Sequence, residues 1–187
     1  MNIIVLTQSG RVVSRPDTSW EKDSRDIYLP DFVKALSLSP VLFVKVTKPG
    51  RSISERFASR YHDSFGFGCL LYAENLMDSH PEAYASASCL DHTSILPADM
   101  LPIDRLSEEQ DFRIYTDGKE LTCCHALEAD QINKAIALAT SHCSVRHGDF
   151  IAIELAPRTA IQASGEGQCT LEAKHNETQT IKLNIIY

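Results

Sequence analysis

Several residues that could act as acids or bases lie at and just after the end of the helix predicted around Ile53, Phe57 and Tyr61. His62 and Asp63 stand at the end of this helix, and Glu74 and Asp78 follow shortly after. An imidazole with carboxylates beside it suits general acid–base catalysis or the binding of a cation. The same residues also fit a helix that ends in a cation and is followed by a solvated face. Both interpretations stay open.

A second group of reactive residues contains sulfur. Cys123, Cys124 and His125 are consecutive, and His142 and Cys143 form another pair. If the segments that carry them met, these side chains could form a zinc site or a thiol–imidazole nucleophilic pair. Their spacing matches no familiar Cys-x-x-Cys element, however, and a buried cysteine commonly acts as a small apolar residue.

Glu154 is a carboxylate within the apolar segment 150–155. Strand alternation places it on the opposite face from Ile151 and Ile153. Because Arg158 is close in sequence, Glu154 could line a pocket, and the alternative is a solvent-facing position.

Three arginines could bind a carboxylate ligand: Arg51, Arg56 and Arg60. The four-residue spacing of the last two also fits an exposed stripe on a helix.

Strands dominate the elements that must position these residues. Alternating or short apolar runs predict strands at 2–6, 11–13, 27–29, 41–46, 69–73 and 150–155. Three hairpins are expected, one at 2–13 joined by Gln8-Ser9-Gly10, one at 111–123 around Asp117-Gly118 and one at 168–186. The pattern predicts an α+β fold, a β-rich mixed roll with few helices.

Two helices are expected. Ile53, Phe57 and Tyr61 recur every four residues after a Ser52 or Ser54 cap, and Asp130 is the predicted cap of a helix that runs to about Cys143. The segment 79–100 is rich in Ser, Ala, Pro and Asp and predicts an irregular excursion.

Length and charge restrict the possible functions. A chain of 187 residues suits a single domain, 1–187. A formal net charge of −7 argues against a nucleic-acid or anionic-membrane partner, since both attract basic surfaces. No apolar run reaches the roughly 20 residues of a membrane span. The absence of an export leader predicts a cytoplasmic protein with reduced cysteines.

The segment from Ser39 to Asp78 resembles the fumarylacetoacetate hydrolase family. It combines the apolar strand 39–46, a helix that starts after Gly50 and ends in Arg60-Tyr61-His62-Asp63, and a Gly66-Phe67-Gly68 strand entry. Arg15-Pro16-Asp17-Thr18 and Leu29-Pro30-Asp31-Phe32 are similar to family segments at matching separation.

The resemblance continues through the second half of the chain. Asp117-Gly118 is similar to a family hairpin turn, and Gly148-Asp149-Phe150-Ile151 is similar to its Gly-Asp-x-Ile strand. The motifs cover residues 15–187 and leave a shortened amino-terminal segment, 1–14. The resemblance implies a homodimer with magnesium- or manganese-dependent chemistry on β-diketo or oxaloacetate-like acids, by carbon–carbon hydrolysis, decarboxylation or tautomerisation.

The carboxylates that hold the family's metal have no counterparts in this chain. A Glu-x-Glu pair and an Asp fall on Ser39, Val41 and Leu70. One hydroxyl and two aliphatic side chains cannot hold a cation that requires oxygen ligands. We therefore expect no metal and no cofactor, with Mg or Mn only if a site has been rebuilt elsewhere.

Three residues are expected to mark what remains of the family's pocket. The helper lysine falls near Ser86, and the Thr-Gly-Thr-Pro turn appears as a segment that contains Glu154 and Leu155. The segment with the general-base histidine has no counterpart.

The leading hypothesis is a pseudoenzyme, a cytoplasmic homodimer with a binding or scaffolding role. Its partner would be a small anionic metabolite or a catalytic relative, and neither nucleic acid nor membrane. The alternative is an active hydrolase or decarboxylase on β-diketo or 2-oxo acids, with a site rebuilt from His62, Asp63 and Glu74 or from the cysteines and histidines. A third possibility is an unrelated β-rich binding module.

Overall fold

The protein contains two β-sheets. The structure is a computed structural model, and it describes residues 1–77, 80, 82–108, 110–161 and 167–187. The larger sheet has nine strands in the order β2-β1-β11-β5-β6-β7-β3, with β12 paired to β5 and β8 paired to β6. Its strands are β1 Ile3–Leu6, β2 Val12–Arg15, β3 Trp20–Glu21, β5 Leu36–Val46, β6 His62–Ala73, β7 Ser94–Ile95, β8 Leu101–Pro102, β11 Phe150–Glu154 and β12 Thr159–Ile161.

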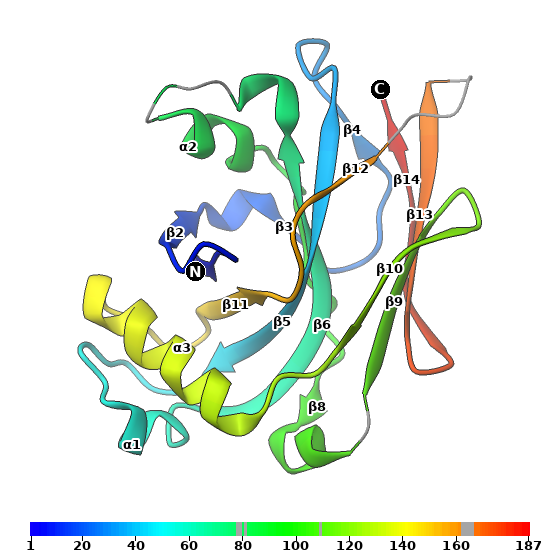
Figure 1. The fold of residues 1–187 in the computed structure, drawn as a ribbon. Coiled ribbons are helices and arrows are strands. Elements are labelled where there is room, and N and C mark those ends of the chain that lie inside the picture. The colour runs from blue at the N-terminus through cyan, green and yellow to red at the C-terminus, as the bar shows by residue number, and fades with distance from the viewer. Residues whose placement is uncertain (78–79, 81, 109, 162–166) are drawn as a thin grey trace.

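The smaller sheet has five strands in the order β10-β9-β13-β14-β4. It packs along one side of the long strands β5 and β6 (Figure 1). Its strands are β4 Ile27–Tyr28, β9 Asp111–Thr116, β10 Lys119–His125, β13 Gln168–His175 and β14 Thr178–Ile186. The α-helices within the described residues are α1 Glu55–Ala58, α2 Ala83–Ser88 and α3 Ala129–His142. The predicted β-rich α+β fold with few helices is confirmed.

Apolar side chains cover both faces of the nine-stranded sheet. The main core joins one face to the five-stranded sheet and to α3. A smaller core fills the concave interior on the other face and is made of Ile3, Val5, Val41, Phe43, Leu70, Tyr72, Leu96, Phe150 and Ala152. Because β5 is buried on both faces, its residues 40–44 form a continuous apolar run instead of an alternating one.

Arg15 closes the nine-stranded sheet into a roll. It lies on the edge strand β2, yet its Nη1 donates to Thr93 O at 3.0 Å and to Ser94 Oγ at 3.2 Å, next to the opposite edge. Its Nη2 donates to Leu71 O at 2.8 Å. These backbone and hydroxyl acceptors satisfy part of a guanidinium that is 1% exposed.

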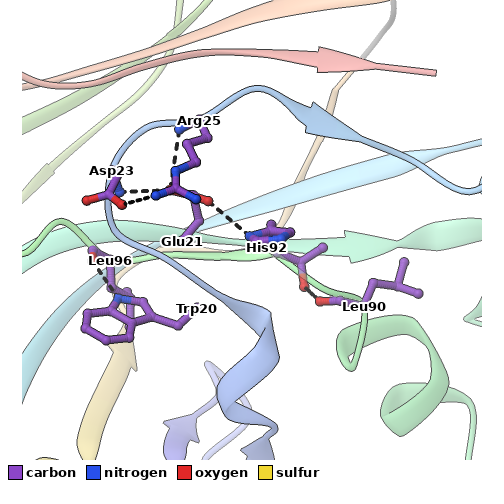
Figure 2. A network of polar contacts seen from close by, with 8 residues as sticks. Trp20, Glu21, Asp23, Arg25, Leu90, His92 and Leu96 are labelled. Atoms are coloured by element: carbon purple, nitrogen blue, oxygen red, sulfur yellow. Dashed lines mark hydrogen bonds and ion pairs between the residues drawn. The ribbon is translucent and has the colours of Figure 1, made fainter.

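A polar network holds the short strands β3 and β7 together at this edge of the sheet (Figure 2). The Trp20 indole N–H donates to Leu96 O at 2.8 Å. Glu21, which is 3% exposed, accepts from the backbone N–H of Asp23 at 2.8 Å and lies 3.0 Å from His92 Nδ1. The short strands β3 and β7 are thereby held in parallel register.

Several predicted boundaries are wrong. Helix α1 ends at Ala58 and not at Tyr61, because the carbonyl of Tyr61 accepts from Thr47 N and so belongs to the extended pairing. Strand β6 begins at His62, well before Cys69, and includes the Gly66-Phe67-Gly68 segment.

Close contacts explain why two positions within β6 are glycine. A Cβ on Gly66 would lie 2.6 Å from the ring of Phe43, and one on Gly68 would lie 2.3 Å from the carbonyl of Ile95. These positions are glycine because neighbouring atoms approach the backbone closely, and not because the chain turns there.

Two further predictions need correction. The N-cap of α3 is Glu128 and not Asp130, because Gln131 Oε1 accepts from Glu128 N at 2.9 Å in a capping box. The described part of 79–100 contains α2 and β7, so it is not wholly irregular. The hairpin at Asp117-Gly118 is confirmed, with positive φ angles of 48° and 75°.

Candidate ligand-binding site

The three positions predicted to correspond to the family's metal ligands lie inside the roll. Ser39, Val41 and Leu70 are each 0% exposed, and the last two belong to the smaller core. The Ser39 hydroxyl donates to Ala156 O at 3.0 Å. Among the described residues, no group of three His, Cys, Asp or Glu side chains could hold a metal ion. These side chains do not fit a divalent cation, which requires several oxygen ligands.

Tyr72 connects this interior to a pocket at its mouth. It follows Leu70 by two residues on β6, so it faces the same interior. Its hydroxyl donates to Glu154 Oε1 at 2.7 Å and lies 2.8 Å from the Tyr84 hydroxyl. Burial raises the pKa values of both tyrosine hydroxyls, which therefore remain neutral donors at physiological pH.

Two guanidinium groups contact the ring of Tyr72. The Cζ of Arg15 is 4.4 Å from the ring centroid, and the Cζ of Arg158 is 5.1 Å from it. Such contacts are attractive because the aromatic face is negative. They hold the ring, and hence its hydroxyl, in place.

Glu154 is 8% exposed, so the alternative of a solvent-facing position is wrong. The hairpin turn between β1 and β2 folds over it, and the backbone N–H of Gln8 donates to Glu154 Oε2 at 2.8 Å. The Gln8 side chain donates to the backbone carbonyl of Glu154 at 2.5 Å. The donors to the carboxylate are thus neutral, and no described basic side chain forms an ion pair with it.

The carboxylate of Glu154 borders a pocket of about 430 Å³. We call it the Glu154 pocket. It lies between the β1–β2 turn, α2 and the segment that follows β11. Its lining residues are Thr7, Gln8, Ser9, Arg11, Val13, Tyr84, Glu154, Pro157 and Arg158.

Glu74 positions one arginine of this pocket. Its Oε1 lies 3.5 Å from Arg158 Nε and accepts a short hydrogen bond from the Ser37 hydroxyl. Arg158 is therefore held between Glu74 and the ring of Tyr72.

The remaining residues expected to mark the pocket lie elsewhere. Ser86 is exposed on α2, and Leu155 packs against the main core. Neither lines the Glu154 pocket. Sequence reasoning missed Gln8, Tyr72 and Tyr84, although the alternation of β6 places Tyr72 on the same face as Leu70.

His62, Asp63 and Glu74 are not brought together. His62 and Glu74 lie at opposite ends of β6, separated by a contour of about 40 Å at 3.3 Å per residue. His62 is buried and Asp63 is exposed, as alternation along a strand requires. Burial lowers the pKa of His62, against the opposing effects of Asn133 and Asp63. Asp78 lies outside the described residues.

The sulfur-containing residues and the surface arginines form no shared site. The six cysteines are free thiols, and His125 pairs with Asp111 at 2.8 Å. The guanidinium groups of Arg56 and Arg60 lie 5.6 Å and 4.9 Å from the ring of Phe57, on the surface.

The fold of this chain is that of the fumarylacetoacetate hydrolase family. A family protein from Yersinia pestis CO92 superposes with a TM-score of 0.81 at 14% identity, over 99% of this chain and 92% of that one. Fumarylpyruvate hydrolase from Pseudomonas aeruginosa, in complex with Mn²⁺ and pyruvate, gives 0.80 at 9% identity, over 100% and 90% of the two chains. These identities establish the fold alone.

An isomerase also has this fold. The 5-carboxymethyl-2-hydroxymuconate delta-isomerase from Mycobacterium smegmatis gives a TM-score of 0.83 at 13% identity, over 99% of this chain and 78% of that one. No family model and no curated protein matches the sequence. No helix among the described residues is long and apolar enough to cross a membrane.

Proposed function

We propose that this chain binds a small anionic metabolite in the Glu154 pocket and carries out no metal-dependent carbon–carbon cleavage. The observation that carries the proposal is the pair of guanidinium groups, Arg11 and Arg158, that line the pocket of a chain with a net charge of −7. Guanidinium groups are suited to carboxylates because their donors match the two oxygens. The interior behind the pocket is packed with apolar side chains.

The test is calorimetric titration with succinate and pyruvate at low ionic strength. We expect Arg11→Gln and Arg158→Gln each to weaken binding at least tenfold, since a charge-assisted hydrogen bond contributes about 1.5–3 kcal/mol. Arg51→Gln is the matched control, because Arg51 is exposed and does not line the pocket. Equal affinities for the wild type and both pocket variants would refute the proposal.

We further propose that the protein works as a cytoplasmic homodimer, or that it pairs with a catalytic relative through the surface that would form the homodimer. The family fold supports this proposal. Light scattering after size-exclusion chromatography should give twice the chain mass of 20.8 kDa. A single species at the chain mass would refute the homodimer.

The second candidate function is catalysis on a β-diketo or 2-oxo acid by a rebuilt site. The hydrogen-bonded Tyr84, Tyr72 and Glu154 favour it, because a carboxylate and a hydroxyl in one pocket can exchange protons with a ligand. Turnover of an acylpyruvate or of oxaloacetate by chelated protein, abolished in Glu154→Gln, would support catalysis. Turnover abolished in His62→Ala or Cys124→Ala would instead place the activity outside this pocket.

A further inference from the structure

Glu154 is a buried carboxylate that has no cationic partner among the residues that the structure describes. It is 8% exposed, its two oxygens accept from the Tyr72 hydroxyl and the Gln8 backbone, and no described lysine, arginine or histidine forms an ion pair with it. Buried charges in proteins are usually paired, since desolvation of a lone carboxylate is unfavourable. Each oxygen retains a lone pair for a further donor.

The arginines of the pocket do not serve as that partner. Arg158 forms its ion pair with Glu74, at 3.5 Å, and Arg11 forms no ion pair with a described residue. The pocket is therefore lined by an acidic residue at the end of β11 and by basic residues from the β1–β2 turn and the segment after β11. Residues of both charge signs border one volume of about 430 Å³.

We propose that the ligand of the Glu154 pocket is a small zwitterion, with an ammonium group that pairs with Glu154 and a carboxylate that pairs with Arg11 and Arg158. This inference rests on the proposed function, because it assigns the ligand class of the same pocket. An ammonium group adds donors to an incompletely paired carboxylate, and the guanidinium pair supplies donors to a carboxylate. Tyr84 also lines the pocket.

The experiment compares L-aspartate with succinate, which differ by one amino group. Calorimetric titration of the wild-type protein is expected to give at least tenfold tighter binding of aspartate. Glu154→Gln is expected to bring the ratio of the two dissociation constants close to one. Arg158→Gln is expected to weaken both ligands and to leave the ratio unchanged, because both ligands keep their carboxylates.

The control variant is Glu177→Gln, since Glu177 is exposed in the turn between β13 and β14. Glu154→Asp is a second variant that keeps the charge, and an intermediate ratio is expected because its reach is shorter. Equal binding of aspartate and succinate to the wild-type protein would overturn the zwitterion and leave the proposed function intact. Binding of neither ligand, and none of pyruvate, would overturn both.

Discussion

Tyr72 is the residue that couples the packed interior of the roll to its pocket. Its ring belongs to the smaller core, and its hydroxyl contacts both Glu154 and Tyr84. A residue with an apolar body and a polar tip suits such a boundary. It lies on the same strand and face as Leu70, one of the positions predicted to replace a metal ligand of the family.

Tyr72→Phe tests this coupling. The substitution leaves the Glu154 carboxylate and the Tyr84 hydroxyl each without one partner, which should lower the free energy of unfolding by about 1–3 kcal/mol. Urea unfolding measures the change. Tyr28→Phe, at a site with 74% exposure, should change it by less than about 0.5 kcal/mol. Equal effects of the two substitutions would contradict the role of the Tyr72 hydroxyl.

His62 gives the stability a dependence on pH. Burial depresses its pKa in the folded state, and burial likewise depresses the pKa of His175. The unfolded chain therefore binds more protons than the folded protein once the pH falls to about 6.5, the ordinary histidine value, and below. The stabilising contribution of the neutral histidines is present above that pH and is lost as the pH falls from there through their depressed folded-state pKa values.

Thermal unfolding between pH 7.5 and pH 5 measures this effect. The midpoint should fall across the range, and His62→Asn should flatten the fall relative to the wild type. His147→Asn, at an exposed position, is the control and should leave the slope unchanged. An unaltered slope in His62→Asn would assign the pH dependence to other groups.

The elements show which features the sequence could predict. The Asp117-Gly118 hairpin and α3 were predictable because a tight turn and a 14-residue amphipathic helix have local patterns. The Glu154 pocket was only partly predictable. Glu154 and Arg158 are neighbours in sequence, whereas Gln8 and Tyr84 reach the pocket through tertiary packing that no local spacing encodes.

Gly68→Ala tests the junction between β6 and β7. The added Cβ would lie 2.3 Å from the Ile95 backbone carbonyl, and backbone cannot move aside as a flexible side chain can. We expect a loss of about 1–3 kcal/mol in unfolding free energy, measured with urea. Ser64→Ala on the same strand is the control. A Gly68→Ala protein of wild-type stability would contradict the prediction, because it would show that β6 and β7 can move apart to accommodate the added Cβ.

For the molecule as a whole, the proposed absence of a metal site makes a thermodynamic prediction. A specific ion at 100 times its dissociation constant would add about 2.7 kcal/mol to the stability. Chelated protein should therefore unfold at the same temperature with and without millimolar magnesium or manganese. A saturable rise of the midpoint would mean that other residues hold a cation.

The pairing of β1 with β11 restricts when the whole molecule can form. Ile3–Leu6 is parallel to Phe150–Ile153, so β1 gains this neighbour only after the roughly 140 residues between the two strands have been synthesised. At about 5–20 residues per second, this wait is roughly 8–30 s. During that time the apolar strand Ile3-Ile4-Val5-Leu6 has only β2 beside it. On the ribosome, then, the roll closes only when β11 returns to β1, and the β1–β2 hairpin stays open to chaperones throughout this interval.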